Sequence, residues 1–268
     1  PGTYTENVDL TGKPYIDLKG ISTRSSTIIT STSGTTLTLA DQSTIVNDIK
    51  ITSTGGKVLE IPAVAATIKY RFAGCSIGAI LTNTYTDAIE IKGGDVQFSR
   101  SFINYIQTGT GGGTHRLVNI TGGSEFHLLT TELIMTVADP DDDVVGITES
   151  NVVAYTHATA SSLEINRTGV VTGDTIGYYA NGTSANKKFS SSDIIITNGG
   201  SGGYGVAIKT TGNTCIVTLQ SNLIKVLNFT TNYSVDVALG DTINSYFDTI
   251  ITADYNTGAG TFNAIHAH

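Results

Sequence analysis

Four aspartates stand close together in the segment ADPDDD at residues 138–143. Carboxylate oxygens are the ligands that Ca²⁺ takes in proteins, and paired carboxylates also act as acid and base on glycosidic bonds. A Ca²⁺ ion needs about six to eight oxygens from several directions, which contiguous side chains on one loop cannot supply alone. We keep two interpretations: a solvated acidic turn, and a calcium site formed by Asp139, Asp141 and Asp143.

A second set of carboxylates is spread over residues 95–164 and is formed by Asp95, Glu125, Glu132 and Glu164. Two carboxyl groups about 5 to 9 Å apart can hydrolyse a glycosidic bond, and neighbouring strands of a sheet are about 4.8 Å apart. A lyase that used the aspartates of 138–143 would also need a cation near them, for which Arg116 and Arg167 are candidates. Such pairs also arise easily by chance, so these residues define an enzyme hypothesis and not a site.

Three tyrosines are candidates for ligand recognition, namely Tyr178, Tyr179 and Tyr204. They lie near segments of irregular length, and the apolar faces of sugars stack on exposed aromatic rings. The alternative is that these rings only cover the side of the fold.

Histidines and cysteines show no pattern that indicates a metal site. The five histidines are His115, His127, His157, His266 and His268. None of them has the paired spacing of a zinc site on one strand or helix. Cys75 and Cys215 are far apart in sequence, so we predict two reduced core residues. Apart from calcium, no cofactor is expected.

Composition predicts an all-β chain. Charged residues make up only 14% of the 268 residues, and long runs of helix-forming residues are absent while Thr, Val, Ile and Tyr are common. The net charge of −8 argues against a nucleic-acid partner, since phosphate neutralisation needs clustered Lys and Arg. No apolar run reaches the length of a membrane span.

A repeat of about 29 residues runs through the chain, as in stacked folds. Four of its copies are residues 88–103, 116–134, 206–224 and 234–251. Each copy alternates apolar and polar residues in three short strands separated by turns. The end of the first strand, taken as a marker, gives a first column of Leu10, Leu39, Ile61, Ile91, Ile120, Tyr155, Tyr179, Ile208 and Val237. The second column is Leu18, Ile49, Phe72, Phe98, Leu128, Ile165, Phe189, Leu219 and Phe247. The third is Ile21, Ile77, Ile103, Ile134, Val171, Ile194, Ile224 and Ile250.

Strands repeated in this way predict one parallel β-helix domain over residues 1–268, with about nine coils and a length of about 43 Å. Loops should project where the units lengthen, at 107–115, 137–151, 179–188 and 197–205. Lys209 is expected on the solvent side of the first strand column. Since the chain begins at Pro1 without Met, we expect a fragment or processed part of a longer chain.

The opening segment, residues 2–20, resembles the first coil of pectin methylesterases and of the wider right-handed parallel β-helix (pectin lyase-like) superfamily. The pattern G-x-Y-x-E-x-V, then K-P-x-I-x-L-x-G, is carried by Gly2, Tyr4, Glu6, Val8, Lys13, Ile16, Leu18 and Gly20. The resemblance covers about twenty residues. It implies right-handed coiling and a long groove that many relatives use for polysaccharides.

The catalytic motifs of these enzymes are absent. Pectin methylesterases carry Q-D-T, D-F-I-F-G and an Arg before Pro-Trp, and none of these occurs in a chain that has no Trp. Polygalacturonases carry N-T-D, G-H-G and R-I-K, whereas here Ala207 stands in the place of that Arg. The resemblance therefore implies a scaffold without the family's chemistry.

Two functional hypotheses follow. The first is a non-enzymatic β-helix of a viral or phage spike or fibre, located at the virion surface or outside the cell. It would form a homotrimer and bind a glycan or a neighbouring structural protein. The second is a lyase or glycosidase of the pectin lyase-like superfamily.

Overall fold

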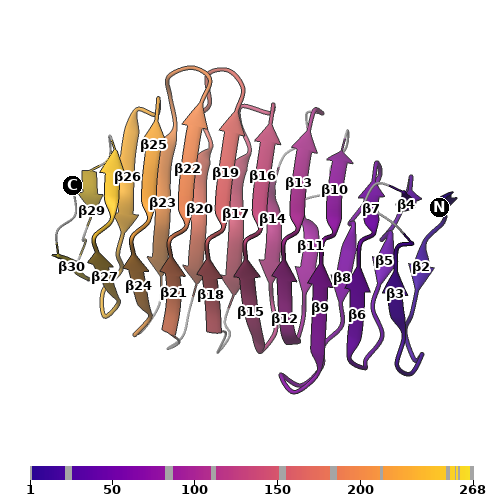
Figure 1. The fold of residues 1–268 in the computed structure, drawn as a ribbon. Coiled ribbons are helices and arrows are strands. Elements are labelled where there is room, and N and C mark those ends of the chain that lie inside the picture. The colour runs from indigo at the N-terminus through magenta and orange to yellow at the C-terminus, as the bar shows by residue number, and fades with distance from the viewer. Residues whose placement is uncertain are drawn as a thin grey trace.

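The computed structural model describes residues 2–21, 26–81, 87–109, 113–150, 155–181, 186–211, 214–251, 254–256, 258 and 260–265. Within these ranges every regular element is a β-strand. Figure 1 shows the strands stacked into a rod, along which the colour of the chain advances steadily from one end to the other. The predicted all-β parallel β-helix is confirmed.

Three parallel ten-stranded sheets, A, B and C, form the sides of the rod, and each pairs every third strand of the chain. Sheet A contains β1 (Gly2–Thr5), β4 (Thr27–Ser31), β7 (Lys50–Ser53), β10 (Ser76–Leu81), β13 (Phe102–Gln107), β16 (Glu132–Val137), β19 (Ser162–Arg167), β22 (Asp193–Asn198), β25 (Leu223–Leu227) and β28 (Thr249–Ile251). Sheet B contains β2 (Val8–Asp9), β5 (Leu37–Thr38), β8 (Leu59–Ile61), β11 (Asp87–Ile91), β14 (Thr114–Ile120), β17 (Asp143–Ser150), β20 (Asp174–Asn181), β23 (Tyr204–Thr211), β26 (Thr231–Asp236) and β29 (Asp254–Asn256). Sheet C contains β3 (Asp17–Lys19), β6 (Thr44–Asn47), β9 (Lys69–Ala73), β12 (Gly94–Ser99), β15 (Ser124–Leu129), β18 (Tyr155–Thr159), β21 (Asn186–Ser190), β24 (Ile216–Gln220), β27 (Thr242–Tyr246) and β30 (Thr261–Ile265).

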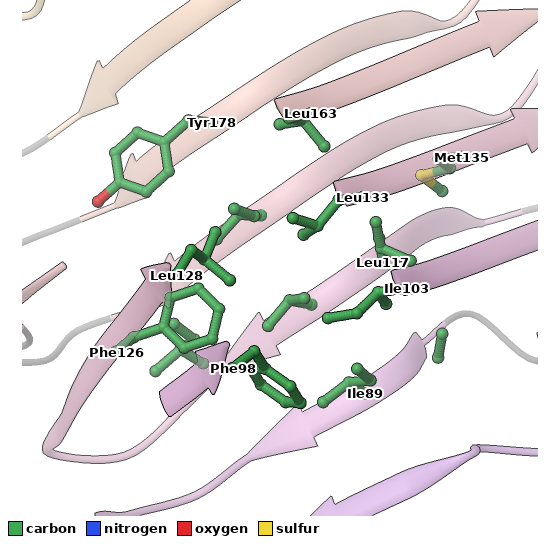
Figure 2. Close-up of a cluster of buried hydrophobic side chains, with 14 of the residues drawn as sticks. Ile89, Phe98, Ile103, Leu117, Phe126, Leu128, Leu133, Met135, Leu163 and Tyr178 are labelled. Carbon is green, nitrogen blue, oxygen red and sulfur yellow. The ribbon is translucent and has the colours of Figure 1, made fainter. Parts of the chain in front are cut away.

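The core is a set of stacked apolar columns, because every second residue of a strand points inward and successive coils are in register. In sheet A, Ile77 pairs with Ile103, and Ile103 pairs with Leu133. In sheet C the rings of Phe72 and Phe98 stack with centroids 4.6 Å apart. Figure 2 shows side chains of this kind from the three sheets pointing toward one another.

A tight turn joins sheet C to sheet A in the eight coils from β6–β7 to β27–β28. Its residues of positive φ are Asp48, Gly74, Arg100, Thr130, Ala160, Ser191, Ser221 and Phe247. In five of these turns the next residue is polar, and its side chain accepts a backbone N–H of the preceding coil. Ser192 Oγ accepts from Ser161 N at 3.3 Å, and Asn222 Oδ1 accepts from Ser192 N at 2.9 Å. This ladder satisfies buried donors that the strands do not reach.

The first predicted column is correct at Ile91, Ile120 and Ile208, which lie in sheet B. After the missed strand β17, several residues were assigned to the wrong strand of their coil. The segment 137–151 was expected to be a projecting loop, yet Asp143–Ser150 is a strand of sheet B. As a result Tyr155 belongs to sheet C, Ile165 to sheet A, and Val171 lies between strands. Six successive residues of β17 are buried, so its sequence lacks the alternation on which the prediction relied.

Smaller corrections concern single residues. Leu133, not Ile134, is the inward residue of β16, and Phe247 lies in a turn with 61% of its surface exposed. Lys209 lies on the outer side of sheet B as predicted, and residues 2–20 do form the first coil, with one strand in each sheet. Within the described ranges there is no helical segment of the length and hydrophobicity needed to cross a membrane.

Candidate functional site

The outer face of sheet B is bent along strands β14, β17, β20 and β23. In each of these strands one residue at an equivalent position is left out of the strand pairing. Between β17 and β20, for example, Val145 pairs with Ile176 and Ile147 pairs with Tyr178, whereas Gly146 and Gly177 form no pair. A Cβ on Gly146 would lie 2.6 Å from the carbonyl oxygen of Gly177, so the backbones approach too closely for a side chain. The repeated skip gives the outer face a concave shape.

Apolar side chains line the floor of this bend. Val145, Ile176 and Val206 point away from the core, yet they are 4%, 6% and 0% exposed. They form an apolar cluster separate from the interior, and Tyr179, Tyr204 and Tyr233 pack against it. The cluster is not needed to close the coil. It supports the tyrosines that cover it, and Val145 and Ile176 also line a hollow, so this part of sheet B is a candidate binding surface.

A hollow of about 250 Å³ opens over this floor. Its polar lining includes Arg116, Asp143, Asp174, Tyr179, Asn181 and Lys209. We call the hollow and the apolar floor together the sheet B groove. Of the three predicted recognition tyrosines, Tyr179 lines the hollow and Tyr204 packs against the apolar floor.

Hydrogen bonds hold the two tyrosines in place. The Tyr204 hydroxyl donates to Asp236 Oδ2 at 2.6 Å, and Lys209 Nζ lies 5.1 Å from the centre of the Tyr204 ring. Burial, followed by the hydrogen bond to Asp236, raises the pKa of Tyr204, so the phenol stays neutral. The Tyr179 hydroxyl accepts from Thr211 Oγ1 at 3.0 Å. Both rings are therefore positioned before any ligand arrives.

Asp143 and Asp174 lie on neighbouring strands at the rim of the groove. The backbone N–H of Asp174 donates to Asp143 Oδ1 at 2.9 Å. Burial raises the pKa of Asp174, the negative charge of Asp143 adds to this effect, and Lys209 opposes it. Arg116 lies close by and pairs with Asp87 at 3.1 Å. The rim thus offers acidic side chains that accept hydrogen bonds and basic side chains that donate them.

Tyr178 does not belong to the groove, which corrects the prediction for this residue. It is fully buried, and its hydroxyl donates to Glu149 Oε1 at 2.7 Å. Glu149 also forms an ion pair with Lys187 and accepts from the Thr156 hydroxyl. Adjacent strand residues face opposite sides, so a difference of one position separates buried Tyr178 from outward Tyr179.

The acidic segment 138–143 is held from inside the coil. Arg167 is 2% exposed, and its guanidinium donates to the carbonyl oxygens of Asp139 at 2.6 Å and Asp142 at 2.9 Å. Burial lowers the pKa of Arg167 to about 10, although the nearby aspartates oppose this shift. Arg167 was a candidate cation for a lyase at these aspartates. It does lie at this segment, but it is buried and its guanidinium binds backbone carbonyl oxygens.

Asp142 takes part in a buried network. Its Oδ2 lies 2.6 Å from His115 Nε2, and His115 Nδ1 lies 2.8 Å from the Tyr105 hydroxyl. Tyr105 and His115 are fully buried. A Tyr–His–Asp chain without solvent access is a structural network and not a catalytic one.

The three predicted calcium ligands already accept hydrogen bonds from the protein. Asp139 accepts from the N–H of Asp141 at 3.1 Å, and Asp141 accepts from Thr172 Oγ1 at 2.8 Å. Among the described residues, one group of three side chains could hold a metal ion. It is formed by Asp95, Glu125 and His127, whose ligand atoms all lie within 4.8 Å of one another. The aspartates 139, 141 and 143 do not form such a group, and calcium binding there stays a prediction.

The other predicted carboxylates are distributed over two sheets. Asp95 and Glu125 are direct neighbours on β12 and β15 of sheet C. Glu132 and Glu164 lie on β16 and β19 of sheet A, two residues out of register. The four therefore do not meet in one site.

Both cysteines are free and buried, as predicted. Burial raises the pKa of the Cys75 thiol to about 11 and that of the Cys215 thiol to about 12. Neither has the lowered pKa of a nucleophilic cysteine.

Sequence reasoning missed the apolar floor of the groove, although a signal was present. The stretches VVGI (144–147), TIGY (175–178) and GVAI (205–208) each place Gly or Ala between two apolar residues, at intervals of one coil. This recurring break in the alternation marks the bend.

Comparisons with protein-family models, with curated proteins and with solved structures gave no match to this chain. The fold is that of a parallel β-helix, while the resemblance of residues 2–20 to pectin methylesterases stays a prediction.

Proposed function

We propose that this chain is a non-enzymatic β-helical recognition module that binds a glycan along the sheet B groove. The observation that carries the proposal is the pair of prepositioned rings, Tyr179 and Tyr204, over an outward apolar floor with a polar rim. Sugar rings have an apolar face that packs on aromatic side chains and hydroxyls that exchange hydrogen bonds with such a rim.

The repeat of the groove favours a polymer. Strands β14, β17, β20 and β23 each contribute to its lining, and their spacing of about 4.8 Å repeats similar groups along the rod. The rim carries Arg116 and Lys209 beside Asp143 and Asp174, so neither charge sign dominates. A neutral or weakly charged polysaccharide fits this mixture better than a polyanion, which needs clustered cations.

The setting that we propose is a viral or phage spike or fibre, at the virion surface or outside the cell. A rigid rod with few charged side chains, 14% of the residues, suits such an appendage. We further propose that the rods associate as a homotrimer through their sides, and that a neighbouring structural protein is the alternative partner. A mass of one chain in light scattering would exclude the trimer.

One observation favours a polysaccharide lyase or glycosidase as a second candidate. Asp143 and Asp174 are adjacent, and the pKa of Asp174 is raised, as in an acid that protonates a leaving group. The carboxylates of this pair, not those of Asp95 or Glu132, would then be catalytic.

A polysaccharide panel distinguishes the two candidates. The purified chain is incubated with each polysaccharide with and without Ca²⁺, and both retention of the chain and release of new reducing ends are measured. Retention without release supports the recognition module. Release that disappears in the Asp174→Asn variant would overturn it in favour of the enzyme, and neither retention nor release would contradict glycan binding.

A further inference from the structure

A second cluster of functional side chains lies on the outer face of sheet C, away from the sheet B groove. Asp95 is on β12, and Glu125 and His127 are on β15, the next strand of the sheet. His127 Nε2 lies 3.7 Å from Asp95 Oδ1 and 3.6 Å from Glu125 Oε2. Both distances exceed a hydrogen bond, and one ligand atom from each of the three side chains lies within 4.8 Å of the other two.

We propose that Asp95, Glu125 and His127 bind a divalent metal ion of the zinc class. One imidazole nitrogen and two carboxylate oxygens form a ligand set typical of Zn²⁺ and its neighbours in the transition series. Ligands about 2.0–2.1 Å from a tetrahedral ion stand about 3.3 Å from one another. The two separations from His127 are a few tenths of an ångström larger, and the two carboxylate oxygens lie within 4.8 Å of each other, so side-chain rotations can bring the three ligands together.

Asp95 is oriented by a supporting partner, as metal-binding carboxylates are. Arg71 on β9 donates to Asp95 Oδ1 at 2.9 Å through one guanidinium nitrogen and contacts Oδ2 through the other. Two carboxylate oxygens have about four lone pairs between them, so one on Oδ1 remains for a metal. Two carboxylates and one guanidinium leave the cluster with a net negative charge that favours a dication.

The site is open on one side. The His127 side chain is 21% exposed and that of Glu125 is 50% exposed. The rings of Tyr155 and His157 flank the imidazole, with centroids 5.8 Å and 6.3 Å from it. A bound ion would complete its coordination with water and exchange readily, unlike a closed structural zinc.

Metal titration of the folded chain tests the proposal. His266 and His268 are first replaced by alanine in every sample, because two histidines near one end of the chain can capture metal by themselves. Zn²⁺ binding is measured by calorimetry, and Co²⁺ is used as a spectroscopic probe of the site. Glu132→Gln is the control for removal of an exposed carboxylate. Far-UV circular dichroism verifies that each variant is folded.

We expect one equivalent of Zn²⁺ to bind, and the affinity to fall about tenfold or more in both the His127→Ala and the Glu125→Gln variants. The visible Co²⁺ spectrum should be lost in His127→Ala and kept in Glu132→Gln. No binding to the background chain would overturn the proposal. Equal affinity of His127→Ala or Glu125→Gln and the control would overturn the three-ligand assignment.

Discussion

Replacement of Lys187 by methionine should destabilise the fold strongly. Lys187 is 2% exposed and Glu149 is 3% exposed, and they form an ion pair inside the coil. Methionine has a similar length but no charge, so the variant leaves a buried carboxylate without its cation. The hydroxyls of Tyr178 and Thr156 still donate to Glu149, yet neither carries a positive charge.

The expected cost is about 3–5 kcal/mol of unfolding free energy, as for other buried pairs that lose one partner. Removal of both charges in the double variant Lys187→Met, Glu149→Gln should recover most of this loss, because no ion then remains to be desolvated.

Equilibrium urea unfolding measures this cycle. The chain has no Trp, so far-UV circular dichroism and tyrosine fluorescence report the transition, and both should coincide. The cycle compares three variants, Lys187→Met, Glu149→Gln and the double variant, and the dependence of their unfolding free energy on urea must have the same slope. A loss below about 1 kcal/mol in Lys187→Met, or a double variant as unstable as the sum of the singles, would refute the buried-pair argument.

Three further predictions concern other parts of the rod. Ser192→Ala removes the acceptor of the Ser161 N–H and should cost about 1–3 kcal/mol in urea unfolding, whereas exposed Ser201→Ala should cost almost nothing; equal effects would contradict the ladder. Asp174→Asn should stabilise the folded chain at pH 7, because the pKa of Asp174 is raised on folding and its ionisation therefore destabilises the fold as pH rises. The gain in thermal unfolding temperature should vanish as the pH falls below 3.8, and a gain that does not change with pH would contradict the raised pKa. Cys75 and Cys215 should not react with a thiol reagent at pH 8 until urea unfolds the chain, and rapid reaction of the native chain would contradict their burial.

The repeat could be predicted because it is local: apolar residues at alternate positions in short strands, separated by turns, recur at the period of one coil. Columns such as Ile77 and Ile103 follow directly from that pattern. The strand β17 could not be found in this way. Its bend buries both faces, and a strand buried on both faces reads as a continuous apolar run.

The sites depend on register, which a sequence specifies less directly than strand content. Tyr178 and Tyr179 are equivalent in sequence terms, and only the phase of β20 decides which one is buried. The cluster of Asp95 with Glu125 and His127 likewise requires that β12 and β15 pair at those positions. A shift of one residue between the coils would move His127 to the interior.

The measurement that tests the central claim most directly is the affinity of groove variants for the polysaccharide that the panel retains. Tyr179→Ala with Tyr204→Ala removes both rings, and Tyr4→Ala on sheet A is the control, since Tyr4 is 52% exposed and far from the groove in the chain. Calorimetry should show a loss of about tenfold or more in the double variant, because each ring contributes about 0.5–1.5 kcal/mol. Equal affinity of the double variant and the control would contradict binding in the sheet B groove.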